Sequence, residues 1–135
     1  MNKWAFILVF LLFTQCRRDE ENIPNVAIDL YLNVNEPDLF DLYPVGGWVY
    51  YTGGSRGLII YHKSFDEYAV FDRHSPYNVG AGCIVEVQDD NILIQDPCSE
   101  SQWILTDGSV VSGPTSQPLK EYQNTFVNPT LHIYN

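Results

Sequence analysis

The residue types best suited to chemistry in this 135-residue chain are two cysteines, Cys83 and Cys98, which stand 15 positions apart. Thiolates bind soft metal ions, and two thiols can also join in a disulfide. One interpretation is a metal pair completed by His74, a second is a disulfide, and a third is two free, buried thiols. Closing a loop of this size stabilises a fold by about 3 kcal/mol in the chain-entropy model. An oxidising compartment favours the disulfide.

The other polar groupings are weaker candidates. The Asp-Asp-Asn run at 89–91, together with Asp96, could offer oxygen ligands to Ca²⁺. Because Ca²⁺ needs about six converging oxygens, we interpret the run as a solvated turn. Ser99 or Ser101 as a nucleophile lacks a histidine whose place the spacing can fix. The glycine-rich segment 52–57 lacks the lysine and helix start of a phosphate-binding loop, so we interpret it as a hairpin turn.

Aromatic residues in the predicted strands suggest a surface on which a sugar could stack. They are Trp48, Tyr50, Tyr51, Tyr61 and Trp103. Because side chains alternate between the two faces of a strand, we interpret most of them as core or sheet-face packing. A surface that binds a glycan or a peptide stays an alternative.

The N-terminal residues have the pattern of an export signal. Lys3 supplies a positive charge, and an apolar run of ten residues covers 4–13. A bilayer span needs about 20 residues, so we interpret 1–15 as a signal peptide. The run ends just before Cys16, which resembles the lipobox cysteine that is acylated in bacterial lipoproteins, although Gln15 replaces the small residue usual there. A plain signal peptide with an incidental Cys16 is the alternative.

Residues 16–25 are interpreted as a lipidated cysteine followed by an acidic linker. The acidic run resembles the export tether of surface lipoproteins in the Bacteroidetes group. The resemblance implies a protein of the cell envelope that is anchored by lipid to the outer membrane. The sequence does not decide which face of that membrane carries the protein, and the outer face, at the cell surface, is one alternative. Acyl chains would supply the anchoring, at about 0.8 kcal/mol per buried CH₂.

Composition limits the partners further. Seven Lys or Arg stand against 17 Asp or Glu, giving a net charge of −10. This balance argues against nucleic acid and against electrostatic adhesion to anionic lipid, because both rely on clustered basic residues. A hydrophobic fraction of 45% is enough for a packed core, and the length allows one domain.

Residues 26–135 are predicted to form one all-β domain without a helix longer than two turns. Short runs of β-branched and aromatic residues alternate with Gly, Pro and Asp-Gly turns, as in a sandwich or barrel. The predicted strands cover 26–33, 48–51, 58–62, 68–72, 83–87, 92–94, 102–105, 110–111, 118–123 and 130–134. The expected core anchors outside these strands are Leu39, Phe40, Leu42 and Tyr43.

Four sequence features resemble the Rieske iron–sulfur domain. The segments 57–62 and 68–73 are similar to the hairpin that precedes the first cluster loop of that family. His-Ser-Pro-Tyr at 74–77 stands where the family has Cys-x-His, and Asp-Pro-Cys-Ser-Glu-Ser at 96–101 stands where it has Cys-Pro-Cys-His-Gly-Ser. The segment 107–119 is similar to the closing pattern of Gly, then Gly-Pro-Ala, then Pro-Leu, and is the most specific match.

The resemblance covers residues 26–134. The earlier part of this stretch is similar to the Bacteroidetes lipoprotein branch of the family. It implies a Rieske-like fold of several sheets, in which two Cys and two His hold a [2Fe–2S] cluster. Carried over to this chain, the four ligand positions are Ser75, Tyr77, Asp96 and Ser99. Three hydroxyls and one carboxylate replace thiolates and imidazoles, so we expect no metal or cofactor at these degenerate positions.

The sequence therefore predicts a cell-envelope lipoprotein whose Rieske-like domain serves as a non-enzymatic binding or structural module. A disulfide between Cys83 and Cys98 would hold the two former cluster loops. An electron-transfer protein with a retained [2Fe–2S] cluster is one alternative, and a surface glycan or peptide binder is another. The predicted partners are the membrane, reached through lipid on Cys16, and an unidentified envelope protein or glycan, but no nucleic acid.

Overall fold

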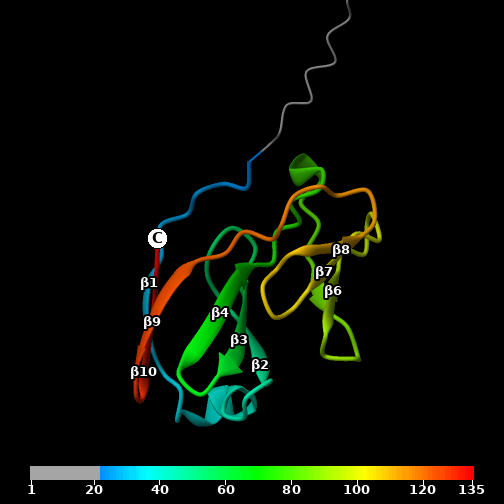
Figure 1. Ribbon diagram of the computed structural model, residues 1–135. Helices are drawn as coiled ribbons and strands as arrows, with labels where there is room; N and C mark the ends of the chain where they lie inside the picture. The colour runs from blue at the N-terminus through cyan, green and yellow to red at the C-terminus, as the bar shows by residue number, and fades with distance from the viewer. Residues whose placement is uncertain (1–21) are drawn as a thin grey trace, which may run out of the picture.

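Short strands in three antiparallel sheets make up this computed structural model, which describes residues 22–135 (Figure 1). Two short 3-10 turns are the only helical elements in that range, and neither could cross a membrane. The prediction of an all-β fold is confirmed. The predictions for the signal peptide, for Cys16 and for the start of the linker fall outside the described residues.

The first sheet joins the two ends of the domain. β1 (Asp29–Asn33) pairs with β10 (Thr130–Tyr134), and β10 pairs with β9 (Gln123–Val127), so the order is β1–β10–β9. The last predicted strand, 130–134, has the predicted bounds. The first is shorter than predicted, because residues 26–28 precede the pairing with β10.

The second sheet lies at the centre of Figure 1 and has the order β2–β3–β4. β2 (Trp48–Tyr51) pairs with β3 (Leu58–Ser64), which forms a hairpin with β4 (Glu67–Asp72). The glycine-rich segment 52–57 connects β2 to β3, as predicted. A 3-10 turn, η1 (Pro37–Leu42), packs beside β2 and β3.

The third sheet is a meander of short strands on the other side of the central sheet (Figure 1). β5 (Glu86–Val87), β6 (Leu93–Gln95), β7 (Gln102–Ile104) and β8 (Val110–Ser112) follow one another in space as in sequence. The turn between β7 and β8 contains Gly108, whose positive φ of +71° suits glycine.

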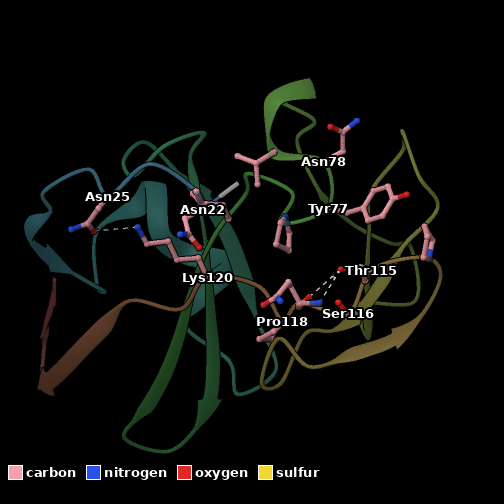
Figure 2. A pocket seen from close by; sticks show the side chains of 13 residues that line it. Asn22, Asn25, Tyr77, Asn78, Thr115, Ser116, Pro118 and Lys120 are labelled. Carbon is pink, nitrogen blue, oxygen red and sulfur yellow. Dashed lines mark hydrogen bonds between the residues drawn. The ribbon is translucent and has the colours of Figure 1, made fainter. Parts of the chain in front are cut away.

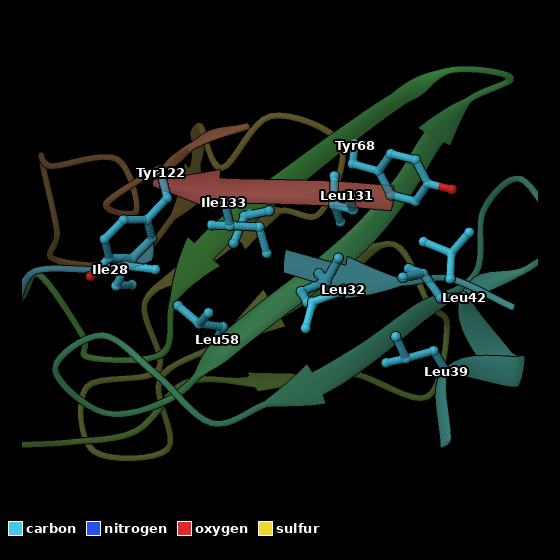
Figure 3. Close-up of a cluster of buried hydrophobic side chains, with 12 residues drawn as sticks. Ile28, Leu32, Leu39, Leu42, Leu58, Tyr68, Tyr122, Leu131 and Ile133 are labelled. Carbon is cyan, nitrogen blue, oxygen red and sulfur yellow. The ribbon is translucent and has the colours of Figure 1, made fainter. Parts of the chain in front are cut away.

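Two hydrophobic cores cover the two faces of the central sheet. Leu58, Ile59 and Ile60 are consecutive in β3, and all three are fully buried. Because side chains alternate along a strand, Leu58 and Ile60 enter the first core and Ile59 enters the second. Figure 3 shows the first core, which lies between the central sheet and the β1–β10–β9 sheet. The second core lies between the central sheet and the meander, and includes Phe71, Val85, Ile94, Trp103 and Leu105.

The prediction that Phe40 and Tyr43 anchor the core is wrong. Their side chains are 75% and 68% exposed, whereas Leu39 and Leu42 are buried. The reason is the 3-10 geometry of η1, in which residues three apart lie on the same face. Leu39 and Leu42 therefore point together into the first core, and Phe40 points to solvent.

The prediction of a strand at 118–123 is also wrong, since β9 begins only at Gln123. The segment before β9 instead crosses from the second core to the first. Leu119 packs in the second core and Tyr122 in the first, while backbone hydrogen bonds tie the segment to the end of β4 at single points. Asp72 N donates to Lys120 O at 2.8 Å, and Tyr122 N donates to Val70 O at 2.8 Å.

A pair of isoleucines around β6 tests the assignment of the second core. Ile94 is fully buried, whereas Ile92 is 56% exposed. Ile94→Ala should lower the free energy of unfolding by about 2–5 kcal/mol, because it leaves a cavity in a packed core. Ile92→Ala should change it by less than about 0.5 kcal/mol. Denaturant unfolding of both variants, with the disulfide intact, makes the measurement, and equal losses would contradict this assignment.

Candidate functional site

Two loops meet at one end of the meander and are joined by a disulfide between Cys83 and Cys98, whose Cα atoms lie 6.3 Å apart. The first loop, 73–85, connects β4 to β5 and contains η2 (Val79–Ala81). The second, 96–101, connects β6 to β7. The predicted disulfide is confirmed, and it excludes the two free thiols and the thiolate metal pair as descriptions of this oxidised state.

The carboxylate of Asp96 is the centre of the loop junction, and Asp96 is fully buried. Ser75 Oγ, from the first loop, donates a hydrogen bond to Asp96 Oδ2 at 2.7 Å. Ser99 Oγ donates to the same oxygen at 2.8 Å, and Cys98 N donates to Oδ1 at 2.8 Å. Ser99 Oγ also lies 2.9 Å from Ser101 Oγ, which accepts a bond from Thr115 N. A buried carboxylate is thus stabilised by hydroxyl and backbone donors from both loops.

The structure brings together three of the four carried-over positions, namely Ser75, Asp96 and Ser99. The fourth, Tyr77, approaches through its backbone, because Tyr77 N donates to Ser75 Oγ at 3.2 Å while its side chain is 38% exposed. These donors do not fit an iron–sulfur cluster. Ser75 and Ser99 both donate to Asp96 Oδ2, and the three side chains offer neither a thiolate nor an imidazole.

His74 does not join the cysteines. Its Nε2 lies 2.8 Å from Val79 O, which can only accept, so Nε2 carries the proton. Nδ1 lies 2.8 Å from Ser55 Oγ, and in the neutral ring it accepts from that hydroxyl. Both nitrogens are therefore engaged in holding the first loop, and the ring is buried.

A second buried carboxylate, Asp72, holds the first loop against the glycine-rich connection 52–57. Its oxygens accept hydrogen bonds from Ser55 N at 2.7 Å, His74 N at 2.8 Å and Tyr122 OH at 2.7 Å. Burial raises the pKa of the Tyr122 phenol, and the hydrogen bond to the Asp72 carboxylate raises this pKa further, so the phenol stays a donor. The sequence analysis missed Asp72, and no local pattern could have indicated it, because Tyr122 is 50 positions away.

Glycine is required where the connection passes over Asp72. Gly54 has a φ of +62°, and a Cβ at this position would collide with the Asp72 carboxylate and lie 2.7 Å from Tyr122 OH. The two oxygens can therefore approach the backbone only because the side chain is absent.

An open groove of about 830 Å³ lies beside the loop junction (Figure 2). One side is formed by 76–79 of the first loop, and the other by 114–118 and Lys120. Asn22, Ile23 and Asn25 also line the groove, and Lys120 Nζ donates to Asn25 Oδ1 at 3.3 Å. The groove gives the junction a recessed surface that mixes polar and apolar side chains.

The other candidate groups do not converge. Asp90 accepts hydrogen bonds from the backbone of Ile92 and Leu93 in its own turn, at 2.8 and 3.0 Å, whereas Asp96 is buried in the loop junction. The hydrogen bond from Leu93 N, followed by the one from Ile92 N, lowers the pKa of the Asp90 carboxyl below its ordinary value. The run at 89–91 and Asp96 are therefore not ligands of one cation site.

The five aromatic residues do not share one surface either. Trp103 is fully buried, and its Nε1 donates to Gln117 O at 2.8 Å. Tyr51 packs against the first core, and Trp48 and Tyr61 pack against the second. Trp48 and Tyr50 line a second, shallow groove with η1 residues. No continuous stacking platform unites the five side chains.

Comparison with models of known protein families finds no match for this chain, and comparison with curated proteins finds no similar sequence. The resemblance to the Rieske domain therefore rests on the sequence motifs alone and stays a prediction.

Replacement of Asp96 tests its central role in the loop junction. Asp96→Ala removes the acceptor of Ser75 Oγ, Ser99 Oγ and Cys98 N, and should lower the free energy of unfolding by about 2–4 kcal/mol. Asp89→Ala removes an exposed acid of the turn between β5 and β6, away from the junction, and should change it by less than about 0.5 kcal/mol. Denaturant unfolding at neutral pH provides the comparison. An Asp96→Ala variant as stable as the control would show that the junction does not depend on this carboxylate.

Proposed function

We propose that this protein is a lipid-anchored protein of the cell envelope whose Rieske-like domain is a non-enzymatic binding or structural module. The observation that carries the proposal is the bonding of Asp96 to Ser75 and Ser99 at 2.7 and 2.8 Å. Three of the four positions that would hold a cluster in the family form here a small hydrogen-bonded set. Their oxygens stabilise the loops and leave no soft donors for iron.

The disulfide supports the same proposal. It joins the two loops that would otherwise be linked through a cluster, and so supplies a covalent tether between 73–85 and 96–101. The groove beside the junction is the proposed binding face, because it is recessed and its walls are the tethered loop 76–79 and the segment 114–118. Electron transfer through a retained [2Fe–2S] cluster is the competing function, and the donor chemistry disfavours it.

The proposed location places the domain on the membrane through lipid on Cys16. The described chain enters the domain at Asn22, beside the groove, and Lys120 contacts Pro24 and Asn25 there. The acidic linker would then connect the anchor to the groove end of the domain. An envelope protein or a glycan is the proposed partner.

Iron and thiol content, measured on one anaerobic sample, tests the cluster-free module. The full chain with Cys16→Ser, purified in detergent, contains only the thiols of Cys83 and Cys98. We expect no iron above the buffer blank, no visible absorbance, and no reactive thiol until denaturant and reductant are added. Iron with cluster absorbance would overturn the proposal. Two reactive thiols without iron would remove the disulfide from it.

Incorporation of labelled palmitate in a bacterial host tests the anchor. The chain with its own leader should be labelled, and Cys16→Ser should lose the label because the acceptor thiol is absent. Thr14→Ser, a conservative change two positions away, should keep it. Equal labelling of the wild type and Cys16→Ser, or none in either, would refute lipidation at Cys16.

A further inference from the structure

Three potential metal-ligating atoms converge at the loop junction: Sγ of Cys83, Sγ of Cys98 and a carboxylate oxygen of Asp96 all lie within 4.8 Å of one another. Among residues 22–135, this is the one group of three or more His, Cys, Asp or Glu side chains whose ligand atoms meet in this way. It differs from the four carried-over positions, since only Asp96 belongs to both sets. In the oxidised protein the two sulfurs are occupied by their mutual bond.

We propose that reduction of the Cys83–Cys98 disulfide turns this junction into a binding site for a thiophilic divalent cation of the Zn²⁺ class. The ligands are the two thiolates and the Asp96 carboxylate, and water fills the fourth position of a tetrahedral site. The inference goes beyond the proposed function. There, Cys83 and Cys98 only tether the loops and Asp96 only accepts hydrogen bonds, whereas here the three residues bind a metal ion.

The disulfide can be opened by a dithiol from the solvent side, because Cys98 is exposed. One thiolate of the dithiol attacks Cys98 Sγ, the disulfide bond breaks, and Cys83 leaves as a thiolate that takes a proton. The second thiol of the reagent then attacks the reagent sulfur that is bonded to Cys98, so that the reagent closes its own disulfide, and Cys98 leaves as a thiolate that takes the second proton. The protein gains two electrons and two protons, and the dithiol becomes a disulfide. Binding of Zn²⁺ releases the two thiol protons to solvent.

The loops remain positioned after the sulfur–sulfur bond is broken. Within the first loop, Ser75 N donates to Cys83 O at 2.9 Å. Within the second, Asp96 N donates to Ser101 O at 2.9 Å, and Glu100 N donates to Asp96 O at 2.8 Å. Across the junction, the bond from Ser75 Oγ to Asp96 Oδ2 does not involve either cysteine. Reduction therefore frees the sulfurs without releasing the backbone that carries them.

The geometry suits a four-coordinate ion. Two sulfurs that each lie about 2.3 Å from a tetrahedral zinc are about 3.8 Å apart. The Cα separation of 6.3 Å between the cysteines can accommodate that spacing by rotation of the side chains. Asp96 Oδ1 accepts one hydrogen bond, from Cys98 N, and a carboxylate oxygen has two lone pairs. One lone pair thus remains for the metal.

The donor set selects among cations. Thiolates favour zinc over calcium and magnesium, which prefer sites made of oxygen alone. Two thiolates and one carboxylate also give the site enough negative charge to balance a divalent ion. The bond partners of His74 exclude it as a fourth ligand, which leaves the exposed side of Cys98 open to water.

Cobalt binding to the full chain with Cys16→Ser tests the proposal, since Co²⁺ reports thiolate ligation by its charge-transfer absorbance. The protein is reduced with a phosphine, desalted without oxygen and titrated with Co²⁺ and then with Zn²⁺. We expect one Co²⁺ per chain with thiolate charge-transfer and tetrahedral visible bands, both abolished by Zn²⁺. The oxidised protein should show neither band.

Three variants separate this site from adventitious binding. Asp96→Asn should weaken Co²⁺ affinity by at least about tenfold, because it removes a charged ligand. Glu100→Gln removes an exposed acid of the same loop and should leave the affinity unchanged. Cys98→Ser should abolish the charge-transfer band under reducing conditions.

The outcomes are decisive in each case. A reduced protein that keeps its far-ultraviolet circular dichroism yet shows no thiolate band would overturn the site, as would equal weakening by Asp96→Asn and Glu100→Gln. If reduction unfolds the chain, restoration of the fold by Co²⁺ supports the site, and failure to restore it overturns the proposal. The iron and thiol measurement on the oxidised protein is a separate test. Its result can overturn the proposed module while the metal site stands, and the cobalt titration can overturn the metal site while the module stands.

Discussion

Both faces of the central β2–β3–β4 sheet have to be covered, because Leu58, Ile59 and Ile60 follow one another in β3 and none reaches solvent. A strand with three consecutive buried apolar residues cannot lie at the surface of a single layer. The β1–β10–β9 sheet covers one face, and the meander from β5 to β8 covers the other. The position of the loop junction follows from this arrangement, since the loop that leaves β4 passes from the central sheet to the meander and there meets the loop between β6 and β7.

The two buried aspartates solve one electrostatic problem in the same way. Asp72 and Asp96 are fully buried in an acidic chain, and neither is paired with Lys or Arg in the described structure. Backbone N–H groups and hydroxyls from distant segments stabilise each carboxylate instead. Because hydrogen bonds to a charged acceptor are stronger than those between neutral groups, each aspartate can order two segments at once.

The loop junction combines features that would serve different purposes in different redox states. When oxidised, the disulfide and Asp96 make it a closed tether beside a recessed surface. When reduced, the same three residues present two thiolates and one carboxylate on a backbone that stays hydrogen-bonded. The proposed structural role and the proposed metal site therefore depend on the same atoms, and the state of one bond selects between them.

The all-β class and most strand positions could be predicted from the sequence alone, and the disulfide was the favoured interpretation of Cys83 and Cys98. Strands at 48–51 and 130–134 have their predicted bounds, because runs of β-branched and aromatic residues between turns carry local information about extended backbone. The expected oxidising compartment favoured a disulfide over a metal pair or two free thiols, and the structure shows the bond. What depends on distant segments could be seen only in the tertiary structure: the late start of β9 at Gln123, and the meeting of Ser75 with Asp96 and of Asp72 with Tyr122. The last two contacts join residues 21 and 50 positions apart, and no local pattern encodes which buried donor will reach a given carboxylate.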